Sequence, residues 1–368
     1  MSDSFPALLR QMISMGATDL FLSKGKPPAY RIHGKIVNTD GAGLSEENLE
    51  LFAVGIMPEE QFNRFNEELE INISYRAAGI GRFRISVFRQ RQNISMVVRA
   101  IPTDIPDPAE LGLPTPMARA IMQKRGLVLI VGSSGSGKST SLASLLNKRN
   151  ERTASHIITI EDPIEYILEH KKSIINQREI GVDTKSFHAA LESALRQSPD
   201  VLGIGEIRSR DTMEQAISFA DTGHLCIATL HANNATQAIE RIVNLFNENS
   251  REQVLLSLSM HIRAILAQQL VPDVNGKLVP AFELLEGSPR MADLIAKGDF
   301  QGMRQHMEKD TSSSMRTMDQ SLYNLYTNNI ISSDTALDFA SSSSNMRLRM
   351  RLSTVASSNL VQLDDVDF

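Results

Sequence analysis

The chain has 368 residues, of which 42% are hydrophobic and 22% are charged, and its formal net charge is −5. This length suits two domains, and the acidic balance gives no electrostatic basis for binding nucleic acid. The single cysteine, Cys226, permits neither an intrachain disulfide nor a cysteine-rich zinc site. No apolar run has the length of a membrane span and the first twenty residues do not resemble a signal peptide, so we expect a cytoplasmic protein.

Residues 1–100 have the pattern of a small α+β domain. A first helix is predicted after Ser4, and two more are predicted at residues 46–56 and 58–68. Short strand-like runs lie around these helices, at residues 19–22, 29–32, 35–37, 71–75, 82–88 and 95–100. Residues 101–116 then contain five prolines, which disfavour a helix and predict a semi-rigid linker between domains.

From residue 117 to about residue 340, short apolar strands alternate with helices. The clearest strands are residues 127–131, 156–160, 201–205 and 225–230, and the helices that follow them are residues 140–149, 187–197, 210–220 and 234–246. Strands that are apolar on both faces and separated by helices imply a parallel sheet covered on both sides. The serine run 341–344 and the acidic end predict a disordered tail over residues 341–368.

A phosphate-binding loop follows the first of these strands and opens a helix, which is the setting that its motif requires. The loop comprises Gly132, Ser133, Ser134, Gly135, Ser136, Gly137, Lys138, Ser139 and Thr140. Its glycines let backbone N–H groups converge on phosphate oxygens at a helix N-terminus. Lys138 would neutralise the β and γ phosphates of ATP, and the Ser139 hydroxyl would ligate Mg²⁺. The alternative is a turn rich in glycine and serine with a chance lysine.

Carboxylates follow two of the other strands. Glu161 stands at the carboxyl end of its strand, where ligands bind in parallel sheets, and is placed to orient or deprotonate the attacking water. Asp162 and Glu165 serve Mg²⁺ or the geometry of the loop, and an acidic surface turn is the alternative for the whole segment. Glu206 ends a strand in the manner of a Walker B carboxylate and would hold Mg²⁺ through water.

The fourth strand begins after His224 and is followed by His231. A histidine at the end of a strand could sense the γ-phosphate, so His231 is a candidate for the site. A hydrogen-bonded structural histidine is the alternative for each of the two.

Together these motifs resemble the secretion-ATPase superfamily and, within it, the type IV pilus retraction ATPases, whose branches are PilT and PilU. The resemblance extends to about residue 340 and is carried by a Walker A motif (132–140), an acidic motif (159–165), a Walker B motif (199–208) and a histidine motif (222–231) that continues to residue 241. It implies a PAS-like N-terminal domain and a RecA-like α/β domain with a mostly parallel sheet. It also implies a ring hexamer with ATP between subunits, at the cytoplasmic side of the inner membrane at the pilus base.

The resemblance assigns roles as well. It makes Glu161 the catalytic glutamate and Glu206 the Walker B glutamate, and it brings Arg84 and Arg99 of the N-terminal domain to the nucleotide. Apart from the resemblance, the expectation for arginines on strands is that they are solvated or paired. The partners it implies are further copies of the chain, a PilT-type ATPase and an inner-membrane pilus platform protein, and no nucleic acid.

Two departures from the family pattern refine this interpretation. One cysteine cannot form the tetracysteine zinc element of assembly-type pilus ATPases. Ala292 and Ala296 stand where PilT-type motors carry arginines, and with the Ala-Asn-Asn-Ala run at 232–235 they favour the PilU branch. The sequence thus predicts an ATP-hydrolysing motor for pilus retraction that assists a PilT-type ATPase. The alternatives are a mainly regulatory ring subunit and a nucleic-acid translocase, which would need a basic channel.

Overall fold

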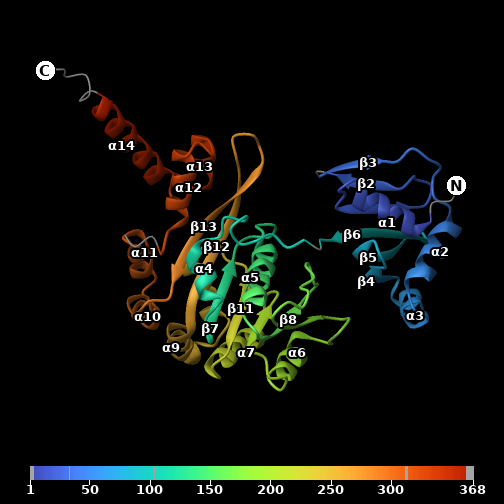
Figure 1. Cartoon of the computed structure of the whole chain (residues 1–368), viewed down its shortest axis with the longest axis horizontal. Helices are drawn as coiled ribbons and strands as arrows, with labels where there is room; N and C mark the ends of the chain where they lie inside the picture. The colour runs from blue at the N-terminus through green and yellow to red at the C-terminus, as the bar shows by residue number, and fades with distance from the viewer. Residues whose placement is uncertain (1–3, 33, 103, 311–313, 362–368) are drawn as a thin grey trace. The chain divides into compact units, whose positions relative to one another are not determined.

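The computed structural model describes residues 4–32, 34–102, 104–310 and 314–361. The chain forms two compact units, Met1–Asp104 with Glu165–Ile167, and Ile105–Ile164 with Leu168–Phe368 (Figure 1). Within the described residues, no helix combines the length and the apolar character needed to cross a bilayer.

The first unit is built on an antiparallel six-stranded sheet of order β3-β2-β1-β6-β5-β4. Its strands are β1 (Asp19–Ser23), β2 (Ala29–Ile32), β3 (Lys35–Asn38), β4 (Glu70–Ala77), β5 (Gly81–Gln90) and β6 (Asn93–Ile101), and its helices are α1 (Phe5–Ser14), α2 (Glu46–Ile56) and α3 (Glu59–Glu68). Phe83, Ile85 and Val87, at alternate positions of β5, are buried, which gives the sheet one core face, and the helices pack their apolar residues into the same core. The small α+β architecture expected for this part is confirmed.

The second unit contains a seven-stranded sheet of order β13-β12-β7-β11-β10-β8-β9. Its strands are β7 (Gly126–Val131), β8 (His156–Glu161), β9 (Ile174–Glu179), β10 (Val201–Ile204), β11 (Leu225–Leu230), β12 (Ile262–Pro272) and β13 (Leu278–Glu286). All neighbouring strands are parallel except β12 and β13, which pair antiparallel. The mostly parallel sheet is therefore confirmed, with an antiparallel hairpin at one edge.

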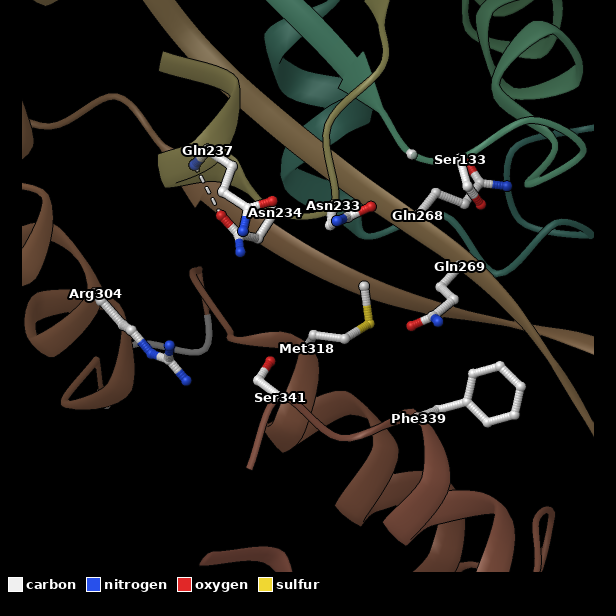
Figure 2. A pocket seen from close by; sticks show the side chains of 11 residues that line it. Ser133, Asn233, Asn234, Gln237, Gln268, Gln269, Arg304, Met318, Phe339 and Ser341 are labelled. Atoms are coloured by element: carbon white, nitrogen blue, oxygen red, sulfur yellow. Dashed lines mark hydrogen bonds between the residues drawn. The ribbon is translucent and has the colours of Figure 1, made fainter. Parts of the chain in front are cut away.

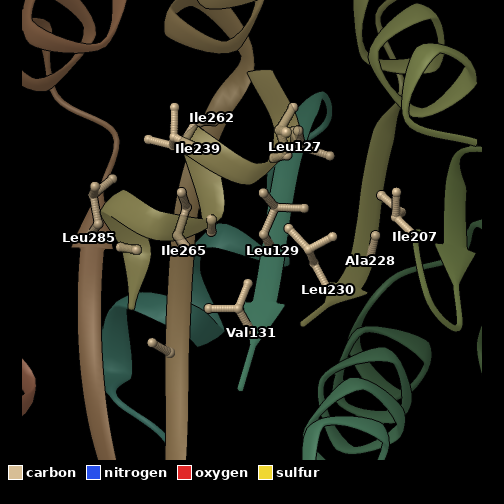
Figure 3. Packing of buried hydrophobic residues seen from close by; sticks show 14 of the residues in the cluster. Leu127, Leu129, Val131, Ile207, Ala228, Leu230, Ile239, Ile262, Ile265 and Leu285 are labelled. Carbon is tan, nitrogen blue, oxygen red and sulfur yellow. The ribbon is translucent and has the colours of Figure 1, made fainter. Parts of the chain in front are cut away.

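Both faces of the central part of this sheet are buried because β7, β10 and β11 are apolar at nearly every position. Along β7, Leu127, Leu129 and Val131 face one core, shown in Figure 3, while Val128 and Ile130 face the other. The first core is covered by α6 (Phe187–Ala194), α7 (Arg210–Asp221), α8 (Ala235–Asn244) and α9 (Arg251–His261), and the second by α4 (Thr115–Ala120) and α5 (Lys138–Arg152). This arrangement places the carboxyl ends of six parallel strands along one edge.

The predicted linker is only partly a linker. The boundary between the two units falls after Asp104, and residues 105–116 pack within the second unit. Ser144 of α5 donates a 2.7 Å hydrogen bond to the carbonyl oxygen of Pro106, and Lys148 of α5 pairs with Asp107. The end of the segment begins α4, with Pro116 in its first turn, and these contacts hold the preceding residues on α5.

The disordered tail expected over residues 341–368 is also corrected. After α10 (Pro289–Ala296), α11 (Phe300–Glu308), α12 (Met318–Thr327) and α13 (Ser333–Phe339), the chain forms α14 (Ser343–Val361). Met346 and Met350, one turn apart, are buried in the core, and the Arg349 guanidinium lies 5.1 Å from the ring centroid of Tyr323. The serine-rich composition predicted disorder, although Met346 and Met350 have the spacing of one helix face. Residues 362–368, with the acidic end, lie outside the described residues.

Candidate functional site

The predicted phosphate loop connects the carboxyl end of β7 to the N-terminus of α5. Gly135 and Gly137 have φ angles of 75° and 87°, in the left-handed region that favours glycine. A Cβ atom at Gly132 would lie 2.4 Å from the Ser136 hydroxyl and from the carbonyl oxygen of Gln268. Glycine is thus required at all three positions by conformation or by close contact.

The polar groups of the loop point inward in a manner suited to an anion. Lys138 is nine-tenths buried, and its Nζ donates to the carbonyl oxygens of Gly132 (3.0 Å) and Ser133 (2.8 Å). The Ser136 hydroxyl is buried and has no hydrogen-bond partner among the described residues. A buried hydroxyl without a partner is costly unless a ligand completes it, and phosphate oxygens would do so. Ser139 and Thr140 follow Lys138 in the first turn of α5.

Glu206 lies just beyond β10 and is held from two sides. One carboxylate oxygen accepts a 2.7 Å hydrogen bond from Arg208 Nε, and the other lies 2.7 Å from His231 Nε2. Its side chain is 16% exposed. The Glu206 carboxylate raises the pKa of Arg208, mainly through this hydrogen bond. The sequence placed Glu206 and His231 in one site, and the structure brings them into contact.

Glu161 ends β8, the neighbour of β10, and its carboxylate is oriented by two side chains. Its Oε1 accepts hydrogen bonds from Thr159 Oγ1 (2.6 Å) and Gln177 Nε2 (3.0 Å). A Cβ atom at Gly205 would lie 3.1 Å from the Glu161 Cα, so the small residue before Glu206 lets the two glutamate-bearing segments approach closely.

The other acidic residues of this segment separate. Asp162 approaches Arg208 at 4.0 Å, at the limit of an ion pair. Glu165 groups with the first unit. Asp162 thus approaches the arginine that also binds Glu206.

The loop and the histidine end of β11 share a pocket. Val131 pairs in register with Leu230, so the loop and His231 leave the sheet side by side. A pocket of about 530 Å³ is lined by Gly132 and Ser133 of the loop, by His231, and by residues of the segment that continues into α8. The predicted phosphate site and the predicted sensor histidine are thus neighbours. His224, in contrast, contacts Thr222 Oγ1 at 3.0 Å and packs on the Phe219 ring at the opposite end of the strand.

A second pocket, of about 380 Å³, lies between the start of the loop and the C-terminal helices (Figure 2). Five of the residues that line it carry side-chain amides, and the others include Arg304, Met318 and Phe339. Lys138, Glu161 and Glu206 are not among the described residues that line it. We assign it no ligand.

Arg84 and Arg99 both lie in the first unit, opposite each other on β5 and β6. Arg99 Nε donates a 2.8 Å hydrogen bond to Asp19, whose buried carboxylate also lies 3.3 Å from Arg31 Nε. Arg99 thus has a structural partner within its own unit. The two arginines form one pair of strand neighbours, and their role toward the nucleotide stays a prediction.

Four further residues contact the site and were given no role from the sequence: Thr159, Gln177, Arg208 and Gln268. Thr159 and Arg208 lie inside the recognised motifs, two residues from the glutamates that they contact, and could have been found by their spacing. Gln177 and Gln268 stand on strands that the sequence did not predict, so only the fold identifies them.

The family model of the type II/IV secretion system proteins matches residues 72–328. The chain is 47% identical over 349 residues to the type IV pilus ATPase PilU of Pseudomonas aeruginosa, which covers 95% of this chain and 91% of that relative. It is 36% identical over 333 residues to the "Type IV pilus retractation ATPase PilT" of the same organism, covering 90% and 97%. The crystal structure of the pilus retraction motor PilT with bound ADP superposes with a TM-score of 0.87 at 40% identity, covering 92% of this chain and 97% of that chain.

Proposed function

This chain belongs to the family of type II/IV secretion system proteins and is a pilus retraction ATPase. We propose that it drives retraction as an accessory to a PilT-type motor. It binds nucleotide and hydrolyses ATP. The observation that carries the assignment is the convergence of the phosphate loop, Glu206 and His231 at adjacent strand ends, with His231 and the loop in one pocket.

We further propose that each group at this edge has a separate task. The loop from Gly132 to Thr140 would bind the phosphates, with Lys138 moving from the loop carbonyls to the β and γ phosphates. Glu161 would orient or deprotonate the attacking water. Glu206 would be kept in place by His231 and Arg208.

The donors fit a nucleotide-bound Mg²⁺ better than a protein cage. No cluster of three or more histidine, cysteine, aspartate or glutamate side chains with the geometry of a metal site occurs among the described residues. Mg²⁺ is commonly held by one or two protein groups together with phosphates and water. Ser139 and Glu206 would supply these groups, the latter through water, and the ion would neutralise charge on the phosphates.

Further parts of the proposal concern assembly. The active form would be a ring hexamer in the cytoplasm, attached peripherally to the inner membrane at the pilus base through the platform protein. Arg84 and Arg99 would reach the nucleotide of a neighbouring subunit, where they would stabilise the charge of the transition state.

The accessory role is supported by helix α10. Met291, Leu294 and Ile295 are its buried residues, and Ala292 and Ala296 lie one turn apart elsewhere on it. The arginines that PilT-type motors carry at these two positions are replaced by methyl groups, so α10 loses two charges while its packing residues remain apolar. ATP turnover would persist with incomplete transmission of force. In the alternative, a mainly regulatory ring subunit, this protein's own hydrolysis would be dispensable.

A retraction assay separates these possibilities. In a strain whose PilT-type ATPase carries an inactivated Walker A lysine, retraction should persist with this protein present and should stop with its Lys138→Ala variant. Loss of retraction in this strain even with the wild-type protein would support the regulatory alternative, because that alternative leaves the work to the PilT-type ATPase. Robust retraction by this protein in a strain without any PilT-type ATPase would refute the accessory role.

A further inference from the structure

Gln268 contacts the phosphate loop although it lies 128 residues after the last residue of the loop, Thr140. It belongs to β12, which runs parallel to β7 with Ala267 in register with Val131. The next residue of β12, Gln268, therefore stands beside the first residue of the loop, Gly132. Its side chain is only 6% exposed.

Three atoms of Gln268 meet the loop or the helix that it opens. Its Oε1 accepts a 2.8 Å hydrogen bond from Ser141 Oγ in the first turns of α5. Its carbonyl oxygen lies 2.4 Å from the position that a Cβ atom would take at Gly132, and its Nε2 lies 2.7 Å from that position at Gly137. Gln268 thus leaves no room for a side chain at Gly132 or at Gly137, and its hydrogen bond with Ser141 connects α5 to β12.

A purely apolar core position would not need this side chain. Burial of an amide costs free energy unless its polar atoms are bonded, whereas leucine or methionine would fill a similar volume without that cost. The amide is planar, so the bond to Ser141 also fixes the direction of Nε2 toward Gly137. The contacts of Gln268 with Ser141 and Gly137 therefore fix the position of the part of the loop that leads into α5.

The loop needs such a support because the hydrogen bonds that Lys138 makes within the loop would change when a phosphate binds. In this structure Lys138 bonds the carbonyl oxygens of Gly132 and Ser133. When Lys138 turns to phosphate, those bonds are given up, while the contacts of Gln268 with Gly132, Gly137 and Ser141 are independent of them. We propose that Gln268 is a positioning residue that keeps the loop in its nucleotide-binding shape when Lys138 leaves the loop carbonyls.

This inference rests on the proposed phosphate site and is tested on the full-length protein with fluorescent ADP and with steady-state ATP turnover. Gln268→Met preserves length and removes both hydrogen-bonding groups. We expect it to raise the Kd for ADP and to lower kcat/KM for ATP by on the order of 10-fold to 100-fold, because a small displacement of a binding group has effects of this size. Ser141→Ala removes one hydrogen bond and should raise the Kd by about 2-fold to 10-fold.

Two controls separate a local effect from general damage. Gln253→Met makes the same side-chain change at an exposed position of α9 and should leave the Kd unchanged. Thermal unfolding of each variant reports any loss of fold. A Kd within twofold of the wild-type value in Gln268→Met overturns the inference. If Gln268→Met does not fold, an unchanged Kd in Ser141→Ala overturns it instead.

Lys138→Ala distinguishes this failure from failure of the site itself. If Lys138→Ala binds and hydrolyses normally, the proposed phosphate site is wrong. If Lys138→Ala is inactive and Gln268→Met is normal, the site stands and only the role of Gln268 is wrong.

Discussion

His231 Nε2 lies 2.7 Å from Glu206 Oε1, so the ends of the neighbouring strands β11 and β10 are joined by a histidine–carboxylate contact. The other carboxylate oxygen bonds Arg208. A histidine at a strand end, which alone is more often a structural residue, here contacts the proposed Walker B carboxylate. Its effect should therefore be on turnover more than on nucleotide binding.

We expect His231→Gln to lower kcat for ATP hydrolysis by on the order of 10-fold to 100-fold, the usual effect of losing a partner that orients a metal-binding group. The Kd for ADP should change little, and both quantities are measured on the same preparation. His224→Gln is the matched control because His224 stands at the opposite end of the same strand, against Thr222 and Phe219. Equal loss in both variants would point to strand stability instead of orientation.

A substitution at Glu161 should also affect ATP turnover without affecting ATP binding. Glu161→Gln keeps the shape and the acceptor for Thr159 Oγ1 but removes the negative charge. We expect ATP to bind as before and turnover to fall by on the order of 100-fold or more, the contribution of a general base. Asp162→Asn serves as the comparison one residue away. Near-normal hydrolysis in Glu161→Gln would transfer the role to Asp162 or Glu165.

The arginines of the first unit allow a test of ring contacts. Arg84 is the better choice, because Arg99 also pairs with the buried carboxylate of Asp19, so its loss would disturb the fold. Mixing Arg84→Ala protein with Glu161→Gln protein should restore part of the ATPase activity, since some interfaces in a mixed ring have both groups intact. Each inactive variant alone is the control. If no mixture regains activity while hexamers form, Arg84 does not act in trans.

Glu283 provides a prediction about pH. Its carboxylate on β13 is buried and accepts hydrogen bonds from the backbone N–H groups of Ala235 (2.7 Å) and Met318 (3.1 Å), at the starts of α8 and α12. Burial raises the pKa of Glu283, although both backbone donors oppose this shift. The folded protein therefore holds this proton more tightly than the unfolded chain, whose glutamate titrates near pH ~4.3.

The sign follows directly. Below the unfolded pKa both states are protonated, and as the pH rises through the window up to the raised pKa, the contribution of Glu283 to the free energy of unfolding falls. Glu283→Gln cannot ionise. The free energy of unfolding of the wild type minus that of Glu283→Gln should thus decrease from about pH 4 upward and then level off, as measured by urea unfolding. A difference that is constant or rises with pH would contradict the assignment.

The sequence by itself determined the phosphate loop, the strand ends at Glu161, Glu206 and His231, and the parallel sheet that gathers them. These features are local, because a motif of nine residues between an apolar strand and a helix specifies its own backbone, and apolar runs mark the strands. The strand order was not needed to expect these ends at one edge, since parallel strands share the direction of their carboxyl ends.

The tertiary structure alone decided which side chains touch them. Gln177 lies on β9, whose burial alternates weakly at the edge of the sheet, and Gln268 lies on β12, in a hairpin whose place beside β7 depends on the packing of the whole unit. Gln268 and Ser141 are 127 residues apart, and no periodicity in the sequence reports a contact between such distant positions. Strand neighbours are selected by the free energy of burying both sheet faces at once, which is a property of the folded unit and not of any one segment.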